Sequence, residues 1–125
     1  MVRKIFRSET ACATEVAWYQ RRPLACMPTL LEHGSDYIVL PYAGEPIGPP
    51  GSRSLFVRYP FLGGWCARVL KELRHQNVSH NDIHPGNILV LDGQFTLIDW
   101  DEARNGASAV DAQQLTEMPT FRLTP

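Results

Sequence analysis

The 125-residue sequence has few cysteines, no long apolar run and almost no net charge. Its three cysteines, Cys12, Cys26 and Cys66, match no zinc or disulfide spacing, so we expect reduced thiols in a cytoplasmic protein. The first residues lack a signal-peptide core, and no apolar stretch is long enough to span a bilayer. A formal charge of −1 also argues against nucleic acid or an anionic membrane as a partner. We therefore expect one modest domain with a single core.

The most informative stretch is a polar loop that leads into an apolar strand. Residues 80–87, named here the polar loop, hold two histidines, an aspartate and two asparagines, and a β-branched, apolar run follows at 88–91. An Asp-Gly pair at 92–93 and a second apolar run at 95–98 predict an antiparallel hairpin. Such a hairpin would bring Asp99 back beside the polar loop.

Two carboxylates and an amide, from Asp82, Asn87 and Asp99, would then converge at one end of this hairpin. Hard oxygen ligands of this kind suit Mg²⁺, which completes its shell with water and phosphate oxygens. The third group could serve as a base. An alternative takes His80 and His84, together with the two aspartates, as ligands of a hydrolytic transition metal. That alternative leaves Asn87 and the apolar strand unexplained.

The N-terminal residues predict a strand followed by a helix. Residues 2–7 alternate in polarity, which places Lys4 on the same face as apolar neighbours. Ser8 can cap a helix that we expect to end at about Arg22, before a proline. Glu15 falls within the apolar stripe of that helix, where an acid is costly unless it has a partner. Lys4 is the obvious partner; otherwise both are ordinary surface charges.

Three further segments follow before the polar loop. Residues 27–44 predict a hairpin, with its turn at 34–36 and a buried second strand at 37–40. The stretch 45–54 is rich in proline and glycine and predicts a linker. Apolar residues from about position 59 then recur with helical spacing and predict an amphipathic helix that ends near Gln76.

These motifs, in this order, resemble the catalytic core of the protein-kinase-like superfamily. His80-Asn81-Asp82, with Asn87 five residues later, is similar to the H-R-D-x-x-x-x-N loop. The sequence His-x-Asp-Ile-His-Pro-Gly-Asn-Ile-Leu, with Asp-Trp-Asp at 99–101 in the D-F-G position, looks more like the atypical and small-molecule branch. That branch includes the aminoglycoside and choline phosphotransferases and the RIO and Bud32-like kinases.

The resemblance implies an α+β, protein-kinase-like fold that is shortened at both ends. Residues 1–45 would form a reduced N-terminal β lobe with its hinge, and residues 46–58 would form a linker. Residues 59–125 would form a shortened, mainly helical C-terminal lobe that carries the polar loop. All three parts would belong to one domain.

The resemblance also implies a phosphotransferase that uses ATP and Mg²⁺ and acts on a hydroxyl of a protein or small molecule. Asp82 would accept or orient the proton of the attacking hydroxyl. Lys4, oriented by Glu15, would bind the α- and β-phosphates of ATP. Asn87 and Asp99 would hold Mg²⁺ against the phosphates.

The hinge would recognise adenine through its backbone. Leu40 would guard the pocket, the carbonyl of Pro41 would accept from the adenine amino group, and the N–H of Ala43 would donate to the ring. His84 would lie at the γ-phosphate. Leu89 would form the floor beneath adenine, and Ile98 would line the same pocket.

Two residues are expected to support the polar loop. The ring of His80 would pack under it, and Asp111 would accept hydrogen bonds from its backbone. The alternative for Asp111 is an ordinary acid in the first turn of a helix, where the helix dipole favours it.

Few residues precede Lys4 to carry a glycine-rich loop, and the stretch after Asp99 is short for a full C-terminal lobe. Three accounts fit: a minimal phosphotransferase completed by a partner or second copy, a pseudokinase-like nucleotide-binding regulatory module, or a truncated gene product. The complete set of motif residues favours the phosphotransferase. Exposed apolar edges would favour a homodimer or a protein partner.

Overall fold

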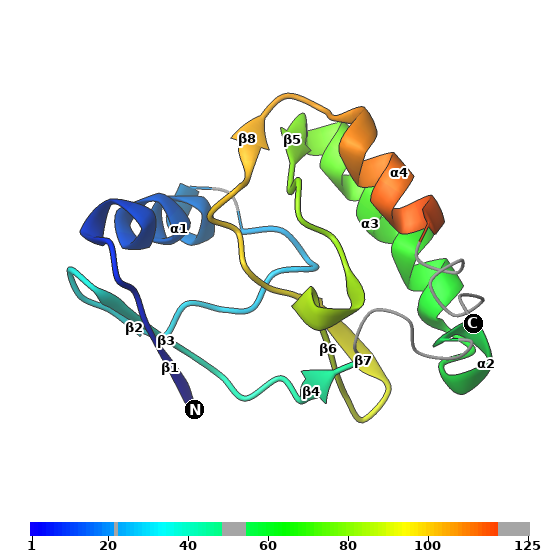
Figure 1. Cartoon of the computed structure of the whole chain (residues 1–125), viewed down its shortest axis with the longest axis horizontal. Coiled ribbons are helices and arrows are strands. Elements are labelled where there is room, and N and C mark those ends of the chain that lie inside the picture. Colours follow the sequence, from blue (N-terminus) through cyan, green and yellow to red (C-terminus); the bar gives the residue numbers. More distant parts are fainter. Residues whose placement is uncertain (22, 49–54, 118–125) are drawn as a thin grey trace.

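Two small antiparallel sheets and three longer helices make up most of the computed structural model (Figure 1). The structure describes residues 1–21, 23–48 and 55–117. In chain order, its elements are β1 (Val2–Ile5), α1 (Glu9–Arg21), β2 (Glu32–His33), β3 (Tyr37–Leu40), β4 (Glu45–Pro46), α2 (Leu55–Arg58), α3 (Leu62–Gln76), β5 (Val78–Ser79), a 3-10 turn (Pro85–Asn87), β6 (Ile88–Leu91), β7 (Gln94–Leu97), β8 (Arg104–Asn105) and α4 (Ala109–Glu117).

The N-terminal sheet has the order β1-β3-β2, and α1 packs against it. Val2 lies opposite Leu40 in the antiparallel register, so the first strand begins beside the predicted hinge. The hydroxyl of Ser8 accepts from the N–H of Ala11 at 3.2 Å, which confirms the predicted helix cap. The predicted end of that helix, at Arg22, lies outside the described residues.

The second sheet, β4-β6-β7, contains the predicted hairpin. Ile88 pairs with Leu97 and Leu91 with Gln94, so the strands are joined by a two-residue turn at 92–93. Both turn residues have positive φ, +51° and +78°, as a tight hairpin turn requires. The register therefore returns the chain to the polar loop, as the sequence predicts.

Helix α3 contacts this sheet through Trp65, whose ring centroid lies 5.6 Å from that of Phe95 on β7. Its buried residues recur with helical spacing, and they include Trp65 and Leu73. The helix begins at Leu62 rather than near Tyr59, and it ends where Asn77 takes the left-handed conformation with φ of +55°. The amphipathic helix predicted from the sequence is thus present, with a start three residues later.

The predicted linker, residues 46–58, differs from the structure at both ends. Its first residue belongs to β4, which pairs with β6 so that Glu45 lies opposite Val90. Its last residues form helix α2, and residues 49–54 lie outside the described part of the chain. Proline and glycine do not prevent a two-residue edge strand, because such a strand needs few ladder hydrogen bonds.

Two connections join parts of the chain that the sequence does not link. The short strands β5 and β8 pair, with Val78 opposite Asn105. The carboxylate of Glu72 on α3 accepts from the backbone N–H groups of Ala25 and Cys26, at 2.7 and 3.3 Å. The loop after α1 is therefore fastened to α3.

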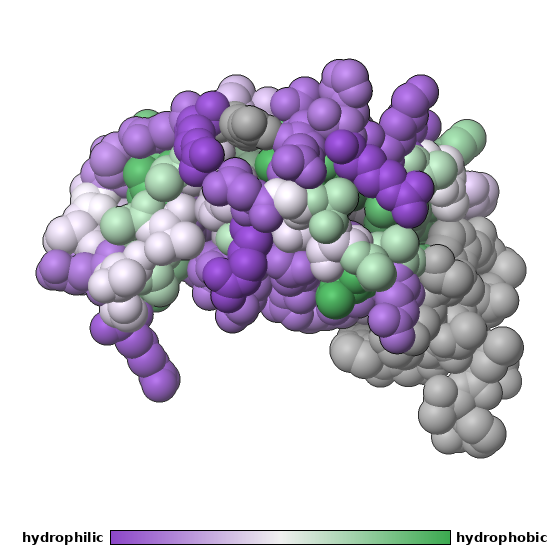
Figure 2. Space-filling view, turned by 90° about the horizontal axis from the view of Figure 1, so that it is seen from above, coloured by the Kyte–Doolittle hydropathy of each residue, from purple (hydrophilic) through white to green (hydrophobic). Residues whose placement is uncertain are grey.

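The face seen in Figure 2 is mainly hydrophilic, with small apolar areas between the polar side chains. This pattern is expected for amphipathic helices that bury one side only. No helix in the described part of the chain is long and apolar enough to cross a membrane.

Candidate active site

The polar loop is held by a buried aspartate from the last helix. Asp111, in the first turn of α4, accepts from the N–H of His80 at 2.8 Å and from the N–H of Asn81 at 2.7 Å. Its side chain is 1% exposed. Asn81 has a φ of +72°, a conformation that asparagine tolerates better than most residues. The prediction that Asp111 supports the loop backbone is confirmed.

His80 supports the loop from beneath, as predicted. Its Nδ1 accepts from the N–H of Asp82 at 3.1 Å, so the proton of the neutral ring lies on Nε2, which donates to the carbonyl of Ile98 at 2.8 Å. Burial lowers the pKa of His80, and the bond to the Ile98 carbonyl opposes that effect only partly. A neutral His80 therefore links the polar loop to the residue before Asp99.

Asp82 and Asn87 contact each other within the polar loop. The amide nitrogen of Asn87 donates to the backbone carbonyl of Asp82 at 2.9 Å and to its carboxylate at 3.2 Å. This orientation leaves the amide oxygen of the buried Asn87 for another ligand. The Asp82 side chain is 44% exposed, and its second oxygen lies 3.8 Å from Nε2 of His84. Asp82 can therefore reach a molecule in solvent.

Asp99 lies beside this pair at the end of the hairpin. The N–H of Ile98 donates to the carbonyl of Asn87 at 2.9 Å, so the backbone of the next residue is adjacent to the polar loop. Asp99 has a φ of +61°, which costs about 1 kcal/mol or more in a residue with a side chain. Such strain is typical of functional positions.

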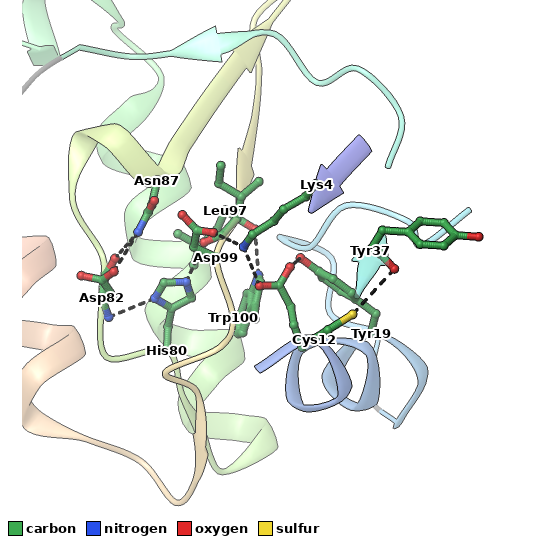
Figure 3. Close-up of polar contacts among 12 residues, drawn as sticks. Lys4, Cys12, Tyr19, Tyr37, His80, Asp82, Asn87, Leu97, Asp99 and Trp100 are labelled. Atoms are coloured by element: carbon green, nitrogen blue, oxygen red, sulfur yellow. Dashed lines mark hydrogen bonds and ion pairs between the residues drawn. The ribbon is translucent and has the colours of Figure 1, made fainter. Parts of the chain in front are cut away.

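Lys4 joins the two halves of the site (Figure 3). Its ammonium lies 2.9 Å from Oε1 of Glu15 and 2.5 Å from Oδ1 of Asp99. Burial alone would lower the pKa of Lys4, but the two carboxylates raise it overall. Burial raises the pKa of Glu15, against the influence of Lys4. The predicted contact between Lys4 and Glu15 is present, and the contact to Asp99 adds to it.

A cavity of about 440 Å³ lies between β1, the hinge segment (residues 41–44) and the end of β7. Its size is within the range of small-molecule sites. Eight of the residues that the sequence assigns to the site line it: Lys4, Glu15, Leu40, Pro41, Ala43, Leu89, Ile98 and Asp99. The other three, Asp82, His84 and Asn87, lie in the polar loop outside the lining.

The hinge passes very close to the second sheet. Gly44 has a φ of +98°, and a Cβ atom built on it would lie 1.8 Å from the carbonyl oxygen of Val90. Only glycine fits this approach without a shift of the backbone. The wall of the cavity is thereby fixed against β6.

The side chains near the polar loop that could act as metal ligands limit which metal could bind. Among the described residues, no three histidine, cysteine, aspartate or glutamate side chains lie close enough together to hold an ion. The transition-metal alternative therefore loses its ligand set. The amide oxygen of Asn87 and the carboxylate of Asp99 are hard oxygen donors, and two protein ligands suffice for Mg²⁺ when phosphate and water supply the rest.

Sequence reasoning missed several residues that shape the site. The side chain of Gln114 accepts from the N–H of Ile83 at 2.8 Å, which gives the polar loop a second attachment to α4. The buried indole of Trp100 donates to the carbonyl of Leu97 at 2.8 Å. Gln114 lies three residues after Asp111, on the same side of its helix, and this spacing is the signal that could have identified it.

Comparison with known proteins agrees with this geometry. Residues 55–117, about half of the chain, match the phosphotransferase enzyme family, APH. The chain belongs to this family. The matched region contains the whole polar loop, the hairpin and Asp111. No curated protein gives a significant match to this member of the family.

The fold is that of a protein kinase. The chain is similar to the crystal structure of the Rad53 kinase domain and SCD2 in complex with AMPPNP, with a TM-score of 0.67 and 15% sequence identity. The match covers 88% of this chain and 52% of that one, so the family member spans about half the length of that kinase structure. The predicted α+β, kinase-like fold is confirmed, with its small N-terminal sheet and mainly helical second part.

Proposed function

We propose that this chain is a Mg²⁺-dependent phosphotransferase that moves the γ-phosphate of ATP to a hydroxyl group. One observation carries the proposal. Lys4 contacts both Glu15 and Asp99 at the wall of a cavity, and Asp99 lies next to the polar loop that carries Asp82 and Asn87. A cation for phosphates, oxygen donors for a metal and a candidate base are thus brought together from distant parts of the sequence.

The nucleotide would occupy the 440 Å³ cavity. Three aliphatic side chains of the lining, Leu40, Leu89 and Ile98, offer apolar contacts for a base. The backbone of Pro41 and Ala43 offers an acceptor and a donor. The similar Rad53 kinase domain was solved in complex with AMPPNP, which supports nucleotide binding in this fold.

The phosphates would extend from the cavity toward the polar loop. Lys4 would contact the α- and β-phosphates, and Asn87 and Asp99 would hold Mg²⁺. The bound ion would neutralise phosphate charge as the γ-phosphate is transferred. The Nε2 atom of His84 lies 3.8 Å from the Asp82 carboxylate, and the His84 side chain is 38% exposed. From this position Nε2 could donate to the γ-phosphate.

Asp82 would accept the proton of the attacking hydroxyl. Asn87 holds one of its carboxylate oxygens, and the exposed fraction of the side chain gives the acceptor access to it. The acceptor could be a protein or a small molecule.

We also expect a reducing compartment, because Cys12, Cys26 and Cys66 are all buried free thiols.

Titration of ATP by calorimetry, with and without Mg²⁺, tests the nucleotide site. Wild-type protein should bind ATP in a Mg²⁺-dependent way, and Asp99→Asn should remove the Mg²⁺ dependence. Asparagine tolerates the positive φ at this position, so the backbone should be unchanged. Asp101→Asn is the matched control, since Asp101 is exposed two residues away and should leave binding intact. No binding of ATP at millimolar concentration would contradict the proposal.

A second candidate function is a nucleotide-binding regulatory or interaction module without catalysis. The cavity lining does not include Asp82, His84 or Asn87, which favours this candidate because a nucleotide could occupy the cavity without contact to the polar loop. Release of ADP from Mg²⁺·ATP, measured with a coupled assay, separates the two. ATP binding without any turnover in the presence of candidate hydroxyl acceptors would favour the module.

The predicted second copy or protein partner stays a prediction. Strand β1 is an outer strand of its sheet among the described elements, and Val2 and Ile5 on it are 45% and 68% exposed. Outer strands with apolar side chains can pair with another chain. Sedimentation at high concentration tests this, and a strict monomer would count against a homodimer.

A further inference from the structure

The carboxylate of Glu15 has two separate donors, one for each oxygen. Oε1 accepts from the ammonium of Lys4 at 2.9 Å, and Oε2 accepts from the hydroxyl of Tyr19 at 3.0 Å. Glu15 is 0% exposed and Tyr19 is 6% exposed. Both also line the 440 Å³ cavity. The contact to Lys4 is therefore only half of what holds Glu15.

A second donor changes what a buried carboxylate can do. With one partner, the group can rotate about its last bond and present either oxygen to Lys4. With a donor on each oxygen, rotation breaks both bonds, and each bond to a charged group in a buried site is among the stronger hydrogen bonds of a protein. Tyr19 lies four residues after Glu15 on α1, so helical geometry fixes the distance between them.

We propose that Tyr19 is a positioning residue of the site: its hydroxyl fixes the Glu15 carboxylate so that Lys4 is held at the wall of the cavity, ready for nucleotide phosphates. This inference rests on the proposed function, because it assigns the cavity to a nucleotide. Tyr19 acts through Glu15 and makes no contact with the phosphates itself.

A second pair of the same chemistry provides the control. The hydroxyl of Tyr37 donates to the carboxylate of Glu32 at 2.9 Å, within the same N-terminal sheet. Neither Tyr37 nor Glu32 lines the cavity that contains Lys4. Loss of a tyrosine hydroxyl can therefore be compared at the site and away from it.

The test measures the affinity of Mg²⁺·ATP for Tyr19→Phe by calorimetry. The substitution keeps the buried ring and removes only the hydroxyl, so packing should be preserved, which circular dichroism and thermal unfolding check. We expect the Kd to rise about tenfold, as for the loss of one hydrogen bond to a charged group. Tyr37→Phe should leave the Kd within about twofold of wild type. Equal losses in both variants would overturn the proposal.

A double-mutant cycle separates action through Glu15 from direct contact with the nucleotide. Glu15→Leu removes the carboxylate at similar volume and should weaken ATP binding by itself. Adding Tyr19→Phe to Glu15→Leu should then cause no further loss, because the hydroxyl has nothing left to position. A further loss of about tenfold in that background would show that Tyr19 contacts the nucleotide, and the proposal would be wrong.

A readout without nucleotide distinguishes this inference from the proposed function. The carboxyl ¹³C resonance of Glu15 can be followed against pH in the free protein. Burial raises the pKa of Glu15, and the contacts with Lys4 and the Tyr19 hydroxyl oppose that effect. The titration midpoint should therefore move to still higher pH in Tyr19→Phe, while Lys4 and Asp99 still face the group in both proteins. An unchanged midpoint would refute the positioning role. A shifted midpoint in a protein that binds no ATP would refute only the proposed function.

Discussion

The imidazole of His80 meets the indole of Trp100 nearly at a right angle, with ring centroids 4.7 Å apart and the planes at 80°. Both side chains are 0% exposed. Each ring also bonds to a carbonyl near the end of β7, His80 to Ile98 and Trp100 to Leu97. The two rings therefore join the polar loop to the strand that positions Asp99.

This arrangement predicts a specific pH dependence of stability. Burial lowers the pKa of His80 in the folded protein below its ordinary value of 6.5. Below that pH the unfolded chain binds a proton that the folded protein excludes, so the free energy of unfolding should fall as the pH falls from 7 toward 5. The contribution of the neutral, buried His80 to the free energy of unfolding is present in full above pH 6.5. Urea unfolding at several pH values measures it.

The slope assigned to His80 should be at most about 1.4 kcal/mol per pH unit. The His80→Gln side chain can still donate to the Ile98 carbonyl. The free energy of unfolding of this variant should depend less steeply on pH over this range than that of wild type. His75→Gln changes an exposed histidine on α3 and should keep the wild-type slope. A His80→Gln variant with an unchanged slope would show that His80 is not the group responsible.

Asp111→Asn should loosen the polar loop. The carboxylate accepts two backbone N–H bonds, and an amide can accept only one of them while its NH₂ faces the other donor. We expect a loss of about 1.5–3 kcal/mol in the free energy of unfolding. Denaturant unfolding measures the loss, and Asp92→Asn in the exposed hairpin turn serves as control. Equal stability of the two variants would contradict the assigned role.

Gly44→Ala should displace the hinge from β6. The new Cβ would meet the Val90 carbonyl, and the positive φ adds its own penalty, for a total loss of about 3 kcal/mol. Gly93→Ala is the matched control, because Gly93 also has positive φ but has no neighbour within 4 Å. That variant should lose only about 1 kcal/mol. Thermal unfolding of both separates the clash from the backbone penalty.

Asp82→Asn should abolish most phosphoryl transfer while sparing nucleotide binding. If Asp82 accepts the proton of the attacking hydroxyl, kcat should fall about 100-fold or more. The Kd for Mg²⁺·ATP should stay within about threefold of wild type, because the cavity lining excludes Asp82. Coupled assay and calorimetry give the two values. Normal turnover in this variant would exclude Asp82 as the base.

Local patterns predict most of the fold. The helical spacing of α3 and the Asp-Gly turn between β6 and β7 each act over a few residues, and both are found where the sequence indicates. The pairing of β5 with β8 was not predictable, because each strand has only two residues and no alternation to detect. The same holds for β4, whose pairing with Val90 depends on how close Gly44 approaches β6.

Within the candidate site, the sequence predicts the residues better than their connections. The contact between Lys4 and Glu15 is predicted from a lysine on a strand and an acid in the apolar stripe of the next helix, and the structure contains it. The second donor to Glu15, the hydroxyl of Tyr19, could not be predicted from the sequence, because a tyrosine at this spacing is also expected as an apolar residue of the helix. Only the folded arrangement shows that its hydroxyl faces the carboxylate.

Several contacts attach the N-terminal sheet and α1 to the rest of the molecule. They include the pairing of Glu45 with Val90 beside the hinge and the hydrogen bond from the N–H of Ala25 to the carboxylate of Glu72. The ion pair between Lys4 and Asp99 differs from these contacts, because both of its residues line the cavity. A motion that separates β1 from the end of β7 and widens the cavity would therefore break this ion pair.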